Sequence, residues 1–240
     1  MVRTERLAKI HSNSERCAGR NAARRLGLRR WSVLGLSACA LSLIPALSVS
    51  AGAQDRMPEI PADKLTPAQK KAAVEVVAAR GGGPLSGPFV ALLRSPEVML
   101  GAKGMGDYLR FKTVLPPKLR EFVIVIVARQ WTQRYEWHSH SDLAVKAGLN
   151  EEIVKAIAEG RRPQGMSAEE ETVFDFCTEL HDNHSVTDAT YARALEKFGE
   201  QGIIDMIGVN GYYTFLSMVM NVARTPAPKG AKHDLAVLPN

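Results

Sequence analysis

The chain has 240 residues, 45% of them hydrophobic and 23% charged, with a formal net charge of +6. This length fits one domain with a sizeable core and is too short for two large domains. Of the 31 basic and 25 acidic residues, residues 1–53 hold nine and two, which leaves 22 and 23 in residues 54–240. Residues 54–240 are therefore near neutral, and the net charge gives no reason to expect a nucleic-acid partner.

Residues 1–53 have the pattern of an export signal. A basic stretch ending at Arg30 precedes an apolar run from Trp31 to Val49, and the small residues Ala51-Gly52-Ala53 follow. This order is typical of a signal peptide. We predict a signal peptide over 1–53, cleavage after Ala53, and export of the mature protein to the periplasm or the outside of the cell.

Two alternatives remain for this leader. Leu36-Ser37-Ala38-Cys39 has the form of a lipobox, which would make the protein a lipoprotein anchored at Cys39. An uncleaved leader would instead be a membrane anchor, since the apolar run approaches the ~20 residues of a membrane span. Pro45 and the small residues after the run favour cleavage. The mature chain would then keep only Cys177, so an internal disulfide is excluded.

After a polar, proline-containing linker at 54–65, the sequence predicts only helices. Several begin at a capping residue followed by proline, as at Thr66-Pro67, and Ser167 to Glu170 form a capping box. No strand alternation, repeat or glycine-rich phosphate loop is visible. We predict an all-α domain of about eight helices over 66–225 and a flexible tail at 226–240. The predicted helices cover residues 66–80, 89–93, 95–112, 116–128, 135–147, 150–159, 167–182, 188–198 and 200–222.

The most apolar of these segments is Phe122 to Ala128, which by pattern alone could be a buried strand. We interpret it as a helix because the element begins at Pro117, exceeds ten residues and lies in a helical chain. A helix that is apolar on most faces is buried on most faces. The segment is therefore the predicted central helix.

Two carboxylates and a histidine are candidates for chemistry. On a helix, Glu136 and His140 are four residues apart and close enough to hydrogen-bond. A carboxylate beside an imidazole fixes its tautomer and raises its pKa, as a proton-transfer pair requires. Glu121 comes just before the apolar segment, near the start of the same predicted helix. The structural alternatives are an ordinary contact within one helix for the pair, and a carboxylate that caps a helix start for Glu121.

The other histidines raise the question of a metal site. His181 and His184, with His138 and His140, are numerous enough to suggest one, but no H-E-x-x-H or comparable ligand spacing is present. Histidines near the end of a helix are also favoured by its dipole. We predict no metal site.

Several segments together resemble the carboxymuconolactone decarboxylase-like family, in the branch with an E-W-x-x-H motif. They are Lys118–Arg129, Tyr135–His140, Leu143-Ala144, Ala147-Gly148 and Val186–Tyr191. The resemblance covers roughly 65–225. It implies an AhpD-like helical fold, a small-molecule substrate, no organic cofactor and a homotrimer or hexamer.

The same superfamily includes the alkyl-hydroperoxidase D type, whose site is a Glu, a C-x-x-C pair and a His four residues after the second Cys. Counting back from His140 places Glu136 and Gln133 at the two cysteine positions and Glu121 at the Glu. Reduction of peroxide by a dithiol needs both thiols, which this chain lacks. Cys177 lies in another predicted helix, and we interpret it as a buried core residue.

The resemblance therefore implies cofactor-free decarboxylation or isomerisation of a small carboxylic acid or lactone. It implies His140 as proton donor or base, Glu136 as its orienting partner and Glu121 as a second proton-handling group. Arg129 would offset the charge of a substrate carboxylate. The alternatives are a peroxiredoxin-like antioxidant oxidoreductase that depends on Cys177, and a non-catalytic oligomer that binds a ligand.

Overall fold

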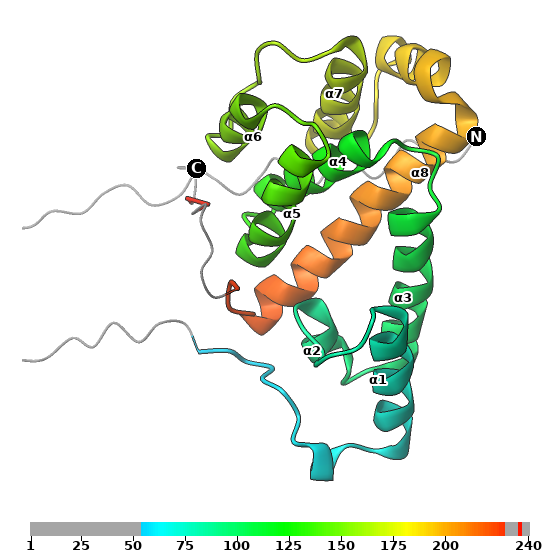
Figure 1. Ribbon diagram of the computed structural model, residues 1–240. Helices are drawn as coiled ribbons and strands as arrows, with labels where there is room; N and C mark the ends of the chain where they lie inside the picture. Colours follow the sequence, from blue (N-terminus) through cyan, green and yellow to red (C-terminus); the bar gives the residue numbers. More distant parts are fainter. Residues whose placement is uncertain (1–53, 229–234, 237–240) are drawn as a thin grey trace, which may run out of the picture. The chain divides into compact units, whose positions relative to one another are not determined.

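The computed structural model describes residues 54–228 and 235–236 (Figure 1). The predicted signal peptide, with Cys39, lies outside the described residues. The described residues contain eight α-helices and one 3-10 turn, η1, and they contain no strand, which confirms the all-α prediction. The elements are η1 (Ala62–Lys64), α1 (Pro67–Ala79), α2 (Pro88–Leu92), α3 (Pro96–Phe111), α4 (Pro117–Gln130), α5 (Arg134–Lys146), α6 (Glu151–Ala158), α7 (Ala168–Asn183) and α8 (Asp188–Ala223).

The hydrogen bonds at the helix starts explain why capping residues in the sequence predicted where helices begin. The Thr66 hydroxyl accepts from the Gln69 N–H at 3.2 Å, while the Gln69 side chain accepts from the Thr66 N–H at 3.0 Å. Ser167 and Glu170 form the same reciprocal pair at the start of α7. Each pair satisfies backbone N–H groups that have no partner within the helix.

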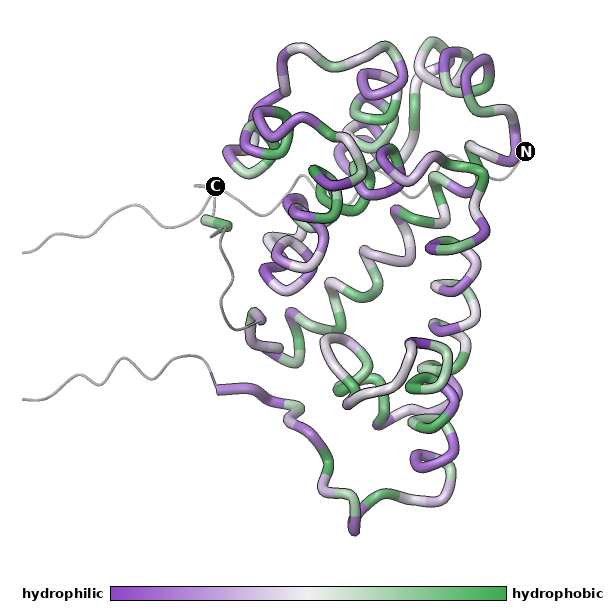
Figure 2. The backbone as a smooth tube through the Cα atoms, in the orientation of Figure 1, coloured by the Kyte–Doolittle hydropathy of each residue, from purple (hydrophilic) through white to green (hydrophobic). Residues whose placement is uncertain are grey.

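Helix α4 is the core of the fold, as predicted. Every residue from Phe122 to Ala128 is at most 3% exposed, and α4 contacts α5, α6, α7 and α8. This apolar stretch lies among the surrounding helices in Figure 2. Burial of one Val, Ile or Phe side chain contributes about 1.5–3 kcal/mol. This outweighs the small helix-propensity cost of the β-branched residues.

Helix α8 is the longest element and crosses the domain diagonally (orange in Figure 1). It breaks at Gly199, whose φ of 65° and ψ of 177° are non-helical, so the two helices predicted on either side of this residue are confirmed. A positive φ there favours glycine. By length and hydropathy α8 could span a membrane, but 56% of its most apolar window is buried in the protein. We interpret it as a core helix.

The segments that flank the helical body contact it. The Arg56 N–H donates to the Ala223 carbonyl at 2.7 Å, and the Arg94 guanidinium donates to the Pro58 carbonyl at 2.7 Å. At the other end of the chain, Leu235 is fully buried. The predicted linker therefore lies against α8 and the loop after α2, and the described part of the predicted tail packs on the core.

Candidate active site

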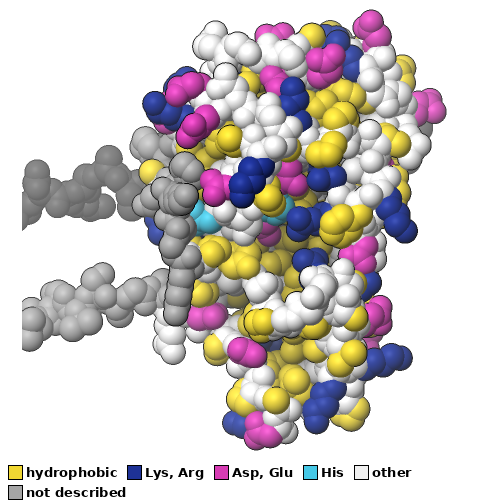
Figure 3. Space-filling model, viewed as in Figure 1, with side chains coloured by type: hydrophobic (Ala, Val, Ile, Leu, Met, Phe, Trp, Pro, Cys, Tyr) yellow, Lys and Arg dark blue, Asp and Glu magenta, His cyan; other side chains and the backbone are white. Residues whose placement is uncertain are grey.

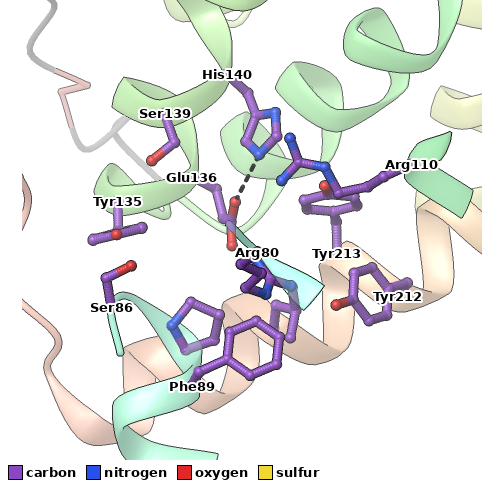
Figure 4. A pocket seen from close by; sticks show the side chains of 12 residues that line it. Arg80, Ser86, Phe89, Arg110, Tyr135, Glu136, Ser139, His140, Tyr212 and Tyr213 are labelled. Atoms are coloured by element: carbon purple, nitrogen blue, oxygen red, sulfur yellow. Dashed lines mark ion pairs between the residues drawn. The ribbon is translucent and has the colours of Figure 1, made fainter. Parts of the chain in front are cut away.

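The three acid–base residues predicted from the sequence meet in the structure. Nδ1 of His140 on α5 lies 2.6 Å from Glu121 Oε2 on α4, and Nε2 of His140 lies 3.4 Å from Glu136 Oε2 one turn earlier on α5. The dashed line in Figure 4 marks the contact between His140 and Glu136. All three side chains are buried, with 3–4% exposure. The imidazole is therefore held between two carboxylates.

The turn between α4 and α5 fixes this geometry. The Gln133 side chain caps α5 by accepting from the Tyr135 N–H at 2.6 Å, and its amide donates to Asn221 on α8 at 2.8 Å. Asn221 in turn donates to the Trp131 carbonyl at 2.9 Å. Gln133, at the position of the first cysteine in the alkyl-hydroperoxidase D type, thus has a structural role.

Electrostatics favour the charged forms of His140 and Glu121. Burial by itself lowers the pKa of His140, but the hydrogen bonds and charges of Glu121 and Glu136 outweigh it and raise that pKa above its usual value. Burial raises the pKa of Glu121, but the hydrogen bond to His140 and the charges of His140, Arg120 and Arg110 lower it overall. Both directions favour an imidazolium–carboxylate pair at this contact.

A pocket of about 180 Å³ opens on one side of this pair. An apolar cavity of roughly 150 Å³ is enough for benzene, so the pocket suits a molecule of about one ring. Glu136 and His140 line it, whereas Glu121 lies behind the imidazole. The lining residues are Arg80, Ser86, Pro88, Phe89, Arg110, Tyr135, Glu136, Ser139, His140, Tyr212, Tyr213 and Leu216 (Figure 4).

Two arginines give the pocket a positive wall. Arg80, just after α1, and Arg110, on α3, both line it. Arg80 stacks over the Phe89 ring at 4.0 Å. Neither guanidinium has a carboxylate within ion-pair distance among residues 54–228. Basic side chains and a histidine lie close together near the middle of the face in Figure 3. Unpaired guanidinium groups in a pocket favour an anionic ligand.

Two tyrosines of α8 complete the wall. The Tyr213 ring meets the His140 ring edge-on at 5.2 Å, and the Tyr212 ring meets the Tyr213 ring in the same way at 5.2 Å. Burial raises the pKa of Tyr212 to about 12 and that of Tyr213 well above its usual value. Both phenols are therefore neutral near pH 7.

Four of the lining residues, Arg80, Arg110, Tyr212 and Tyr213, were not predicted from the sequence. They come from three segments that are far apart in the sequence, and nothing local marks an arginine or a tyrosine as facing a pocket. The one available signal was the presence of two adjacent tyrosines in an otherwise apolar helix.

Arg129, the predicted substrate contact, does not line this pocket. Its Nη1 donates to the carbonyls of Ala236 at 2.7 Å and Ala158 at 3.3 Å, and its Nη2 donates to the Thr132 hydroxyl at 2.8 Å. It is 7% exposed. Because α4 turns this side chain toward α6 and the C-terminal segment, the geometry connects parts of the fold and gives no support for a substrate contact here.

Cys177 is also remote from the pocket. It is fully buried on α7, and the Asn210 amide donates to its Sγ at 3.3 Å. Burial raises the pKa of this thiol to about 12, so it is protonated and a poor nucleophile.

His181 lies 3.0 Å from the same Asn210. Within the described part of the chain, no group of three or more His, Cys, Asp or Glu side chains could hold a metal ion.

The fold is shared with solved structures. The apo debrominase Bmp8 aligns with a TM-score of 0.58 and 14% identity, covering 75% of this chain and 95% of that one. A variant of Bmp8 in complex with 2,3,4-tribromopyrrole gives 0.57 and 13%, with coverage of 73% and 92%. An uncharacterized peroxidase-related protein from Silicibacter sp. TM1040 gives 0.59 and 14%, with coverage of 78% and 100%. At these identities the likeness concerns the fold alone.

Comparison with curated protein sequences finds no match. The sequence model of the carboxymuconolactone decarboxylase family matches residues 96–179, from the start of α3 into α7. This match confirms the resemblance seen in the motifs. The matched segment contains Glu121, Glu136 and His140, the three candidate acid–base residues.

Proposed function

We propose that the protein is a cofactor-free acid–base enzyme that decarboxylates or isomerises a small carboxylic acid or lactone. The observation that supports this most is the buried imidazole of His140, held between Glu121 and Glu136 on the wall of a pocket of about 180 Å³. Burial and two carboxylate partners are how proteins tune a histidine for proton transfer. The match of residues 96–179 to the carboxymuconolactone decarboxylase family model agrees with this class of chemistry.

The geometry supports a division of roles that differs from the one inferred from the sequence. Glu121 lies behind the ring and binds Nδ1, so we assign it the orienting role that the family resemblance implied for Glu136. Glu136 contacts Nε2, the ring nitrogen on the pocket side of the imidazole. The Glu136 side chain itself also lines the pocket. The His140–Glu136 pair is then the proton-transfer unit that meets the substrate.

The reaction balances without a cofactor. In decarboxylation, the bond between the carboxylate carbon and its neighbour breaks, CO₂ leaves, and the electron pair passes into a conjugated carbonyl as an enolate. The His140–Glu136 pair then supplies one proton to the carbon. In isomerisation, the same pair removes a proton from one carbon and returns it to another. Arg80 and Arg110 would bind the substrate carboxylate.

The test is turnover of a panel of small lactone acids and conjugated carboxylic acids by the wild type and by His140→Ala. General acid–base catalysis contributes about 10²–10⁴-fold, so we expect a loss of at least ~100-fold. His181→Gln is the matched control, because His181 lies outside the pocket. Turnover by the His140 variant at the wild-type rate would refute the proposal.

We also propose that the protein is an exported homo-oligomer, as the resemblance and the leader imply. Several apolar side chains are exposed, among them Phe111 (69%), Ile204 (66%) and Val222 (57%). Exposed apolar residues that form one contiguous patch mark contacts with another protein. Light scattering of the mature chain tests the oligomeric state, and a monomer at micromolar concentration would contradict the oligomer. The N-terminal residue of the protein recovered from the host cell tests cleavage after Ala53.

A further inference from the structure

The Tyr212 hydroxyl is a buried polar group without a partner. Tyr212 is 3% exposed, and its Oη makes no hydrogen bond to any described residue. A buried hydroxyl that makes no hydrogen bond destabilises the fold, because it loses its contacts with water and gains none in return. Phenylalanine would fill the same space without that cost. A group of this kind at the wall of a pocket is explained if a ligand accepts its hydrogen bond.

The Tyr212 side chain lines the pocket, and its hydroxyl lies against α3. In Figure 4, Tyr212 projects from α8 with its oxygen directed toward the side of the pocket that holds Arg80. On α3, a Cβ at Gly106 would lie 2.3 Å from the Tyr212 oxygen. Glycine at 106 is therefore needed for the hydroxyl to occupy this place. Arg110, one turn further along α3, lines the same pocket.

The protonation state of the Tyr212 phenol allows it to donate a hydrogen bond. Burial raises the pKa of Tyr212 to about 12, so the phenol keeps its proton near pH 7. Arg80 and Arg110 contribute positive charge to the same wall. A neutral donor beside fixed cations stabilises negative charge that develops on an oxygen, and in a buried site such donors act more strongly than in water.

We propose that Tyr212 is a catalytic residue whose hydroxyl donates a hydrogen bond to the substrate oxygen that becomes negative during the reaction. This inference rests on the proposed function. When the C–H or C–CO₂ bond breaks, the electron pair moves through the new C=C bond onto the carbonyl oxygen. Tyr212 keeps its proton and stabilises that enolate oxygen, while the His140–Glu136 pair handles the transferred proton.

Binding of 4-nitrophenolate, a one-ring mimic of an enolate, tests the inference on the full chain without knowledge of the substrate. Its absorbance reports both occupancy and protonation state. A hydrogen bond to a charged group is worth about 1.5–3 kcal/mol, or roughly 10- to 150-fold in affinity. We therefore expect Tyr212→Phe to weaken phenolate binding by about tenfold or more and to raise the pKa of the bound probe.

The same substitution removes an unpaired group, so Tyr212→Phe should unfold at the same temperature as the wild type or higher. Tyr108→Phe is the matched control. Its hydroxyl donates to Asp205 at 3.1 Å and accepts from Gln201 at 3.2 Å, away from the pocket. This control should lose thermal stability and bind the probe as the wild type does.

Equal probe affinity in the wild type and Tyr212→Phe would overturn the inference, as would a wild type that binds no phenolate. Its failure is distinguishable from failure of the proposed function, which depends on turnover by the His140 variant. If His140→Ala loses turnover while Tyr212→Phe binds the probe normally, only the Tyr212 inference is wrong. If turnover survives in His140→Ala while Tyr212→Phe binds the probe weakly, the proposed reaction is wrong, and Tyr212 remains only a hydrogen-bond donor to a bound oxyanion.

Discussion

Glu121 Oε2 lies 2.6 Å from His140 Nδ1, although the two residues are 19 positions apart and on different helices. The contact joins the most buried helix, α4, to α5, one of the helices that line the pocket. It leaves Nε2 as the only ring nitrogen available to Glu136 and the pocket. The position of Glu121 therefore decides which side of the imidazole can act on a substrate.

Replacement of Glu121 by Gln should lower the pKa of His140. Burial disfavours the imidazolium, and the Glu121 hydrogen bond is the first of the interactions that oppose it. Without that charge we expect the pKa to fall below the wild-type value, as NMR titration of the imidazole would show. Glu152→Gln, at an exposed ion pair with Lys155, should leave the titration unchanged. An unaltered pKa in Glu121→Gln would contradict the charged pair.

The same pair predicts how stability depends on pH. The pKa of Glu121 is lowered from 4.5, so its contribution is present above pH 4.5 and is lost as the pH falls through the lowered value. The pKa of His140 is raised from 6.5, so its contribution is complete below pH 6.5 and is lost as the pH rises through the raised value. The stability difference between the wild type and His140→Gln should therefore be largest between pH 4.5 and 6.5.

Urea unfolding of both proteins at a series of pH values measures this difference. A difference that stays constant from acid to alkaline pH would show that the pair is not charged in the native state. His181→Gln serves as the control, because burial lowers the pKa of His181, and its pH dependence should have the opposite sign.

Replacement of Arg110 by Met should weaken the binding of small carboxylates. Arg110 is half-buried, lines the pocket and has no carboxylate partner among the described residues. A charge-assisted hydrogen bond is worth about 1.5–3 kcal/mol, so we expect benzoate affinity, measured by calorimetry, to fall about tenfold. Arg80 is more exposed, and Arg80→Met should have a smaller effect. Arg94→Met, which removes a contact with Pro58 outside the pocket, should bind benzoate normally.

Replacement of Arg129 by Met should reduce stability without changing turnover. The guanidinium joins the Ala158 and Ala236 carbonyls and the Thr132 hydroxyl. Loss of these bonds should lower the free energy of unfolding by about 2 kcal/mol, as urea titration would measure. A drop in kcat/KM at unchanged stability would restore the substrate role that the sequence suggested.

The sequence by itself determined the helices and one half of the site. Caps and prolines such as Thr66-Pro67 act within a few residues, so they are visible locally. The continuous apolar run from Phe122 to Ala128 identified the central helix, because such a helix must be buried on all sides. Glu136 and His140 are neighbours because they lie one turn apart on a single helix.

Only the tertiary structure decided the rest. Glu121 meets His140, and Arg80, Arg110 and Tyr212 share its pocket, because α1, α3, α4, α5 and α8 pack against one another. Arg129, one residue from the end of α4, points away from the pocket. Helix periodicity predicts which residues share one face of a helix. Which other helix packs against that face depends on how all the side chains of the core fit together.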